Sequence, residues 1–362
     1  IESKLLGETR RVRVALPRSY DRSKRPCGVL YLLDGESLFV QATGAVRHLV
    51  DDDVLPLIVV GVDNVARTRD LTPEARPAQM EDFPAGGGSK AFRRFLVDEL
   101  RPFIESKYRV GPVRLLAGHS FGGLFAAETL LDEPDAFTGY LILSPSFWWD
   151  DDRFVERFES VGHQHGLFER FVWFGIGEED GPMNGPFERV TWSLRQRAPL
   201  GFWWGSRVFH GEDHWHAALP ALGAGLKAFM APIREIANGV KTFEELEARA
   251  ARVSKTVGVE LSLGRAVIGD AARQLSKRGE TDASIALLTD AMAKLADEPY
   301  FAYARSLALQ EAGRYDDAVA TLEAALEKFA KDPRHKDAVG PLTETLARMR
   351  GKAKGGEAGK SR

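Results

Sequence analysis

A glycine–serine motif in the first half of the chain has the residue types of a nucleophilic site. Gly118, Ser120 and Gly122 form the pattern Gly-x-Ser-x-Gly, directly after the apolar run Leu115–Ala117 and directly before an amphipathic segment. In this context the pattern predicts a strained turn from a strand into a helix, which lifts the serine hydroxyl out of a sheet. The alternative, a glycine-rich turn with an incidental serine, is disfavoured by this flanking context.

A serine hydroxyl becomes a useful nucleophile only when a base takes its proton, and imidazole is the usual base near neutral pH. In sites built on this turn the partners follow in the order serine, acid, histidine. Three histidines follow the last expected strand: His210, His214 and His216. We favour His214 because it lies well into the loop, with His216 as the alternative, whereas His210 belongs to the strand end.

The acid that orients the imidazole should come from the loop after the preceding strand. Glu178, Glu179 and Asp180 all lie there. Asp180, three residues past Gly177, has the reach and is the predicted acid, with Glu179 and then Glu178 as alternatives. At least some of these carboxylates are expected to belong only to a solvated acidic turn.

The oxyanion of an acyl-transfer intermediate needs two backbone N–H groups. One is predicted at Phe121, immediately after the nucleophile. The other is predicted at Gly35 or Glu36, in the loop after an apolar strand over residues 28–33.

Aromatic residues lie beside these motifs in the sequence and are candidates for an apolar or aromatic substrate pocket. Core packing is an equally weighted interpretation of them. They are Phe147, Trp148, Trp149 and Trp215.

Two arginines, Arg67 and Arg69, are candidates for binding an anionic group of a substrate. An ion pair between Arg67 and Asp70 that fixes the loop is at least as well supported. A catecholate–iron substrate would need several converging cations, and these two arginines are the candidates that the sequence offers.

Metal and cofactor sites are not expected. The pairs His163-x-His165 and His214-x-His216, with Glu212 and Asp213, lack a third ligand at the spacing of zinc hydrolases. Because Cys27 is the single cysteine, an intrachain disulfide and a multi-cysteine metal site are both excluded.

The elements that must position these residues alternate between strands and helices. Continuous apolar runs predict buried strands at residues 28–33, 57–62, 140–143 and 171–177, with a half-buried strand at 10–16 and a last strand at 202–209. Helical spacing marks residues 90–108 and 217–230. The polar motifs fall after the strands, which is typical of a doubly wound, mostly parallel α/β sheet with its ligand site beyond the strands' carboxyl ends. This domain is expected over residues 1–235.

The remainder of the chain is helical in pattern and repeats internally. Gly279 and Gly313 lie 34 residues apart, as do Pro299 and Pro333, and this offset is the tetratricopeptide period. A tetratricopeptide-like domain is predicted over residues 236–350, with a protein partner or self-association as its use. The low-complexity tail over residues 351–362 is expected to be disordered.

Composition limits the class of protein further. The 362 residues are 44% hydrophobic and 28% charged, as in soluble globular proteins. A formal net charge of −3 implies no general attraction to nucleic acid or anionic membranes. No apolar run reaches membrane-spanning length. The start at Ile1 rather than methionine slightly favours a processed periplasmic or secreted protein, although one cysteine also fits the cytoplasm.

Together these motifs resemble the putative esterase family of α/β hydrolases, which includes siderophore-trilactone esterases, esterase D type enzymes and feruloyl esterases. The resemblance covers nearly all of the α/β region and is closest to the siderophore-esterase-like branch, whose members often carry a tetratricopeptide-like extension. It implies an α/β-hydrolase fold, Ser120 as nucleophile, His214 as base and an acid from the 178–180 loop. The motifs that carry it are Tyr31-Leu-Leu-Asp-Gly-Glu36, Gly118-His-Ser-Phe-Gly-Gly123, Ser144-Pro-Ser-Phe-Trp-Trp149 and Gly211-Glu-Asp-His214.

Three functional hypotheses follow from these observations. The first is a serine esterase that acts through an acyl-enzyme on an ester or lactone, either siderophore-like or an aryl or carbohydrate ester. The second is a binding scaffold in which the repeats hold a partner and the hydrolase domain is secondary or inert. The third is acyl transfer from the same serine to an acceptor other than water.

Overall fold

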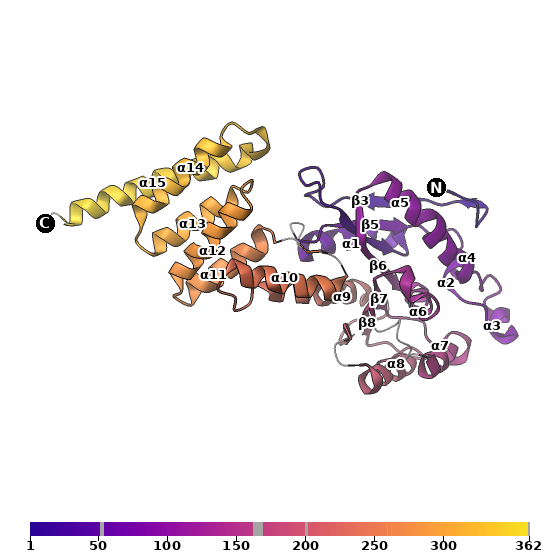
Figure 1. Cartoon of the computed structure of the whole chain (residues 1–362). Helices are drawn as coiled ribbons and strands as arrows, with labels where there is room; N and C mark the ends of the chain where they lie inside the picture. The colour runs from indigo at the N-terminus through magenta and orange to yellow at the C-terminus, as the bar shows by residue number, and fades with distance from the viewer. Residues whose placement is uncertain (51–53, 162–168, 200–201, 259, 262, 361–362) are drawn as a thin grey trace. The chain divides into compact units, whose positions relative to one another are not determined.

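The computed structural model of the chain describes residues 1–50, 54–161, 169–199, 202–258, 260–261 and 263–360 (Figure 1). The chain divides into two compact units. The first, the α/β unit, runs from Ile1 to Ala231, and the second, the helical unit, covers most of the chain from Pro232 onward. The division falls inside helix α9 (Ala218–Arg234), near the boundary expected at residues 235–236.

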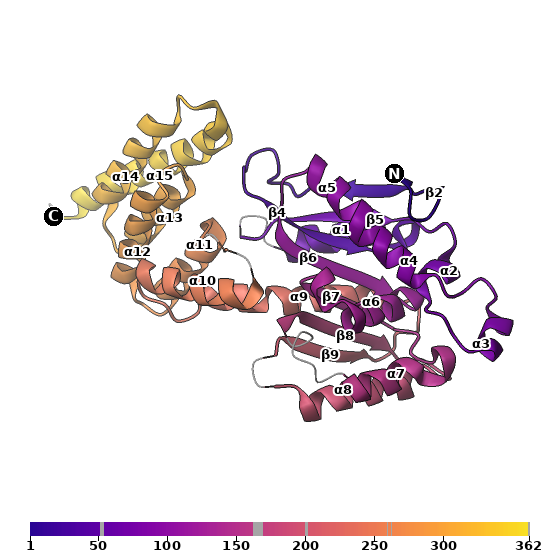
Figure 2. The same ribbon diagram turned by 45° about the vertical axis from the view of Figure 1, so that its right-hand side comes forward.

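The α/β unit is built on a seven-stranded sheet in the order β3-β5-β4-β6-β7-β8-β9 (Figure 2). The edge strand β3 pairs antiparallel with β5, and the other neighbours are parallel. Every residue of β4, β5, β7 and β8 is buried. The predicted mostly parallel α/β sheet is therefore confirmed. The strands are β3 (Val12–Ala15), β4 (Cys27–Leu32), β5 (Leu57–Val62), β6 (Val110–His119), β7 (Gly139–Leu143), β8 (Phe171–Gly177) and β9 (Trp204–Phe209), with β1 (Glu2–Ser3) and β2 (Glu8–Thr9) forming a separate pair.

Helices cover both faces of this sheet. Alternate residues of β4, such as Val29 and Tyr31, share a core with the helices between β5 and β9, while Gly225 of α9 packs against Leu141 of β7. The helix predicted over residues 90–108 is α4, a π-helical segment (Phe95–Leu100) and α5. The helices before α9 are α1 (Gly35–Leu49), α2 (Arg67–Leu71), α3 (Pro77–Asp82), α4 (Ser89–Arg94), α5 (Arg101–Lys107), α6 (Phe121–Asp132), α7 (Trp149–Val161) and α8 (Asn184–Arg197).

The helical unit consists of antiparallel helix pairs with a repeating turn. Gly279 and Gly313 stand at equivalent turns, α11–α12 and α13–α14, and both have positive φ angles, of 78° and 73°. Glycine adopts that conformation without the strain other residues incur, which accounts for its recurrence after 34 residues. The helices are α10 (Phe243–Val257), α11 (Arg265–Lys277), α12 (Thr281–Lys294), α13 (Tyr300–Glu311), α14 (Tyr315–Phe329) and α15 (Lys336–Lys360).

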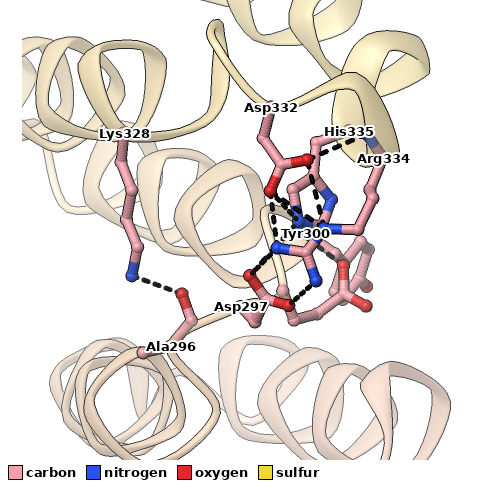
Figure 3. Close-up of polar contacts among 8 residues, drawn as sticks. Ala296, Asp297, Tyr300, Lys328, Asp332, Arg334 and His335 are labelled. Carbon is pink, nitrogen blue, oxygen red and sulfur yellow. Dashed lines mark hydrogen bonds and ion pairs between the residues drawn. The ribbon is translucent and has the colours of Figure 1, made fainter.

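Ion pairs join two loops of the helical unit, the α12–α13 connection and the α14–α15 connection (Figure 3). The Arg334 guanidinium donates to both Asp297 oxygens, at 2.9 and 3.2 Å, and also to Asp332. Hydrogen bonds from Arg334 lower the pKa of Asp332 to about 2. His335 lies close enough to both carboxylates for the three side chains to resemble a metal-ligand set. Because Arg334 already bonds both carboxylates, we interpret the cluster as a structural ion-pair network.

Helix α15 continues to Lys360, past Gly351, where the sequence predicted a disordered tail. Among the described residues, no helix has both the length and the hydrophobicity needed to cross a bilayer.

Candidate active site

The turn that carries Ser120 has the strained geometry that its motif predicts. Strand β6 ends at His119, helix α6 begins at Phe121, and Ser120 between them has φ 60° and ψ −118°. Such a conformation is costly for a non-glycine residue and is typical of functional sites. A Cβ atom on Gly118 would lie 2.1 Å from the Gly122 carbonyl oxygen. Position 118 therefore accepts only glycine while the turn keeps this shape.

The neighbouring strand β7 anchors this turn. The Ser120 amide donates to the Leu143 carbonyl at 3.0 Å, and the Ser146 amide donates to the Ser120 carbonyl at 3.1 Å. The two hydroxyl oxygens, Ser120 Oγ and Ser146 Oγ, lie 3.3 Å apart. A Cβ atom on Gly123 would lie 2.7 Å from the Leu143 carbonyl oxygen. The absence of a side chain at position 123 therefore allows helix α6 to pack closely against the end of β7.

A histidine–carboxylate pair lies at the carboxyl ends of β8 and β9. His214 Nδ1 is 2.7 Å from Glu179 Oε2. The other Glu179 oxygen, Oε1, accepts hydrogen bonds from Ser144 Oγ at 2.5 Å and from the Gly177 amide at 3.2 Å. The Glu179 side chain is only 2% exposed, and burial alone would raise its pKa. Hydrogen bonds from His214 and Ser144 outweigh burial, so the pKa of Glu179 lies below its ordinary value and the carboxylate stays ionised.

A second histidine connects this pair to the turn. His119 Nε2 is 2.7 Å from the backbone carbonyl oxygen of His214, and the two rings are 4.6 Å apart between centroids. Burial, with the nearby His214 charge, lowers the pKa of His119 to about 4. The imidazole is therefore neutral at pH 7. Because a carbonyl oxygen can only accept, the proton is assigned to Nε2.

The Ser120 turn and the His214–Glu179 pair open into one cavity of about 370 Å³. Ser120 and His214 both line it, at the edge of the sheet where the parallel strands end. The other lining residues are Phe121, Ser146, Trp148, Glu178, Glu179, Asp180, Met183 and Asp213.

The acid favoured from the sequence, Asp180, does not make the hydrogen bond to His214. Side chains alternate as the chain leaves β8, so Glu178 and Asp180 are exposed while Glu179 is buried. Glu178 instead lies 2.6 Å from the exposed ring of His210 through its Oε1. The structure therefore brings together the favoured histidine and the first alternative acid.

The alternative base, His216, is 75% exposed, and its Nδ1 lies 2.8 Å from Asp213 Oδ1. The same Asp213 oxygen accepts hydrogen bonds from the amides of Trp215 and His216. Asp213 thus shapes the histidine loop. The sequence pair His163 and His165 lies outside the described residues.

The loop after β4 lies beside the Ser120 turn, as an oxyanion site requires. A Cβ atom on Gly122 would lie 3.4 Å from Asp34 Oδ2, and one on Gly35 would lie 2.8 Å from the backbone of Gly61. Phe121 is the first residue of α6, where helical amides have no intrahelical acceptor. The Glu36 carboxylate accepts hydrogen bonds from Asn64.

The two candidate anion-binding arginines are engaged by carboxylates. Arg67 donates twice to Asp34, at 2.6 and 3.0 Å, and once to the His119 carbonyl at 3.2 Å. The alternative pair of Arg67 with Asp70 is therefore wrong. Asp70 is buried and bonds Arg10 and Arg69 instead, and Arg69 also bonds Glu8.

The aromatic candidates separate into cavity and core. Trp148 lines the cavity, whereas Trp149 is 2% exposed and packs against the rings of Phe83 and Phe121. Phe147 is fully buried. Trp215 is 73% exposed and lies edge-on to His214. Core packing, the alternative interpretation, therefore applies to Phe147 and Trp149.

Ser144, Ser146 and His119 also belong to this arrangement, and the sequence did not mark them as site residues. Each stands inside a motif that carried the family resemblance. What the sequence lacked was a sign of which polar side chains turn toward the nucleophile.

Family models match the chain in two places. A model described as putative esterase matches residues 3–219, and one described as tetratricopeptide repeat matches residues 275–340. The chain belongs to the putative esterase family. The resemblance stated from the motifs, with its tetratricopeptide-like extension, is thereby confirmed.

Named relatives include three siderophore esterases. Ferri-bacillibactin esterase BesA of Bacillus subtilis is 36% identical over 140 residues, which are 34% of this chain and 48% of that protein. Siderophore enterobactin esterase of Emericella nidulans is 36% identical over 153 residues, 37% of this chain and 50% of that protein. Siderophore triacetylfusarinine C esterase of Aspergillus fumigatus is 31% identical over 161 residues, 40% of this chain and 53% of that protein. The chain thus spans about half the length of the curated relatives it matches.

Solved structures share the fold. An IroE-like serine hydrolase from Shewanella oneidensis superposes with a TM-score of 0.68 at 24% identity, covering 79% of this chain and 96% of that one. An uncharacterised protein from Capnocytophaga ochracea superposes with a TM-score of 0.62 at 17% identity. The match covers 97% of this chain and 98% of that one. The second similarity extends the shared fold through the helical unit.

Proposed function

We propose that the chain is a serine-dependent ester hydrolase. The observation that carries the proposal is the 2.7 Å contact between His214 Nδ1 and the buried Glu179 carboxylate, in the same cavity as Ser120 on its strained turn. A carboxylate on Nδ1 fixes the tautomer that leaves Nε2 free to accept a proton, and it stabilises the imidazolium that forms. Family membership and relatives named as esterases support the same reaction.

In the first half of the proposed reaction, Ser120 Oγ attacks the ester carbonyl carbon and His214 Nε2 takes the hydroxyl proton. The negative oxygen is stabilised by the Phe121 amide and by the amide of Gly35 or Glu36. His214 then gives the proton to the departing alkoxide, which leaves as an alcohol. In the second half a water molecule attacks the acyl-enzyme, and the same histidine transfers the water's proton back to Ser120.

The proposed substrate is a carboxylic ester or a lactone. Three relatives are named as siderophore esterases, so siderophore esters and lactones are the first class to test. Aryl and carbohydrate esters are the second class.

The test is labelling with a fluorophosphonate probe, which reacts preferentially with an activated serine. We expect one adduct, mapped to Ser120 in the intact chain and lost in Ser120→Ala. The same variant should lose hydrolysis of p-nitrophenyl butyrate while its circular dichroism spectrum is unchanged. No adduct in a folded protein, or undiminished hydrolysis by Ser120→Ala, would contradict the proposal.

The match to the tetratricopeptide repeat supports a second candidate function, protein binding by the helical unit. The binding-scaffold hypothesis would be favoured by two results together. The folded protein would react with neither the probe nor a panel of esters, and it would still bind a peptide or protein through the helical unit. Product analysis with added alcohols separates hydrolysis from acyl transfer, because a transferase would form new esters.

A further inference from the structure

Ser144 stands between the two halves of the proposed catalytic set. It directly follows strand β7, which lies in the sheet between β6, before the nucleophile turn, and β8, before the acid. The Ser144 amide donates to the Gly175 carbonyl of β8 at 2.7 Å, and the preceding Leu143 carbonyl accepts from the Ser120 amide. The backbone here is therefore bonded on one side to the strand that leads to Glu179 and on the other to the nucleophile turn.

The backbone conformation of Ser144 is strained. Its φ angle is 40°, in the left-handed region that glycine adopts freely and that other residues adopt at a cost. A residue with a side chain persists in such a conformation only where the surrounding structure holds it, and such positions cluster at functional sites. The presence of a serine rather than a glycine at position 144 points to a use for its hydroxyl.

The Ser144 hydroxyl is buried, and its partner is a buried carboxylate. Ser144 is 0% exposed, and its Oγ donates to Glu179 Oε1 at 2.5 Å. The same carboxylate oxygen accepts from the Gly177 amide, while Oε2 lies against His214 Nδ1. Two donors thus hold one oxygen of Glu179, and this leaves the other directed at the imidazole.

The charge of Glu179 depends on these donors. Burial is the largest influence on the pKa of this carboxyl group and acts to raise it, whereas hydrogen bonds from His214, Ser144 and the Gly177 amide lower it. Two imidazoles face the carboxylate, that of His214 from the loop after β9 and that of His119 from the end of β6. Unlike His214, the Ser144 hydroxyl keeps the same charge throughout the proposed reaction.

We propose that Ser144 is a positioning residue of the esterase site, whose hydroxyl orients the buried Glu179 carboxylate toward His214 and keeps it ionised. This inference rests on the proposed function and adds a fourth side chain to the series from Ser120 through His214 to Glu179. The described residues that line the cavity do not include Ser144. Its removal should therefore lower kcat and leave KM nearly unchanged.

The first test compares two variants that both remove the hydroxyl. Ser144→Ala keeps the strained backbone, whereas Ser144→Gly relieves the strain of the positive φ angle, so that at least the second should fold well. We expect each to lower kcat on p-nitrophenyl butyrate by about tenfold or more, the loss expected for a hydrogen bond to a buried charge. Urea titration reports whether each variant is folded. Full activity in Ser144→Gly would overturn the inference, because strain and not the hydroxyl would then be what matters.

The pH dependence of kcat/KM is a readout that a purely structural role would not move. Without the Ser144 donor, the influence of burial raises the pKa of Glu179, so the carboxylate takes up a proton at a higher pH. Activity should then be lost earlier on the acid side. We expect the midpoint of the acid limb to move upward by about half a pH unit or more in Ser144→Ala.

The matched control is Ser3→Ala. Ser3, in β1, is also a buried serine, and its hydroxyl donates to a glutamate, Glu99 Oε2, at 2.5 Å. This variant loses the same kind of hydrogen bond outside the proposed catalytic set, and it should leave kcat and the pH profile unchanged.

A double-mutant cycle tests whether Ser144 acts through Glu179. In a Glu179→Gln background the charge that the hydroxyl stabilises is gone, so adding Ser144→Ala should lower kcat by about twofold or less.

The outcomes separate the two proposals. An unchanged kcat and pH profile in Ser144→Ala would overturn this inference and leave the esterase function standing. An equal loss from Ser144→Ala with and without Glu179→Gln would overturn it as well. Hydrolysis of no ester by the folded wild-type protein would overturn the proposed function, and this inference with it.

Discussion

His119 and His214 are joined by a 2.7 Å hydrogen bond from the ring of the first to the backbone carbonyl of the second. His119 precedes the proposed nucleophile, and His214 is the proposed base. The bond therefore ties the loop after β9 to the turn after β6. We interpret His119 as a positioning residue that keeps the imidazole of His214 within reach of Ser120.

Replacing His119 with phenylalanine keeps a ring in place but removes the donor. We expect kcat/KM to fall by about tenfold, the equivalent of losing one hydrogen bond of ordinary strength. Most of the loss should lie in kcat rather than KM, because substrate contacts are not removed. His119→Gln, whose amide can donate, should recover part of the activity. Equal activity in all three proteins would refute a positioning role.

The stability of the α/β unit should depend on pH through His119. Its pKa is about 4 in the folded chain and about 6.5 when unfolded, so the unfolded state binds the proton more tightly. The free energy of unfolding is therefore unaffected by this titration above pH 6.5, and it decreases as the pH falls from 6.5 to 4. The loss is on the order of 3 kcal/mol.

Tryptophan fluorescence in urea measures this effect, because all seven tryptophans lie between Trp148 and Trp215, within the α/β unit. The difference between wild type and His119→Phe isolates this one titration from the others. The wild type should lose stability relative to the variant as the pH is lowered to 4. A constant difference would show that His119 does not titrate in this range.

Glu179 and Asp180 should differ sharply when each loses its charge. Glu179→Gln removes the buried carboxylate that holds His214, so we expect kcat on p-nitrophenyl butyrate to fall by about 10²–10⁴-fold, the range for general-base catalysis. Asp180→Asn, whose side chain is exposed, should lose far less. A larger loss in Asp180→Asn would restore Asp180 as the acid.

Two glycine substitutions should change stability in opposite directions. In Gly118→Ala the new methyl group would meet backbone atoms of Gly122 at 2.1 and 2.3 Å, so we expect a loss of several kcal/mol and of probe labelling. Gly44→Ala, at an exposed position of helix α1, meets no atom within 4 Å and should add about 0.5–1 kcal/mol. Urea titrations of both variants measure the contrast. Tolerance of alanine at position 118 would mean that the turn is looser than described.

The sequence predicted the strands and the serine turn well because their signals are local. Apolar runs such as Leu57–Val62 are long enough to mark buried parallel strands without help from distant residues. Gly118 of the turn is demanded by the backbone of Gly122, only four positions away.

Which side chains meet at the site was less predictable, because that depends on alternation and on distant partners. Reach along the chain favoured Asp180, but one step of alternation turns Glu179 inward to His214. Arg67 finds Asp34, 33 positions away, instead of the nearby Asp70. Such choices are set by the three-dimensional neighbours of each side chain, which spacing alone does not encode.

The order of the strands has a consequence for how the protein is made. Strands β6 to β9 are consecutive in the chain and adjacent in the sheet, and the segments after them carry Ser120, Ser144, Glu179 and His214 in turn. Ser144, Glu179 and His214 can thus be brought to Ser120 by pairing each newly synthesised strand from β7 onward with the one before it. We expect this edge of the sheet to form before synthesis of the helical unit is complete.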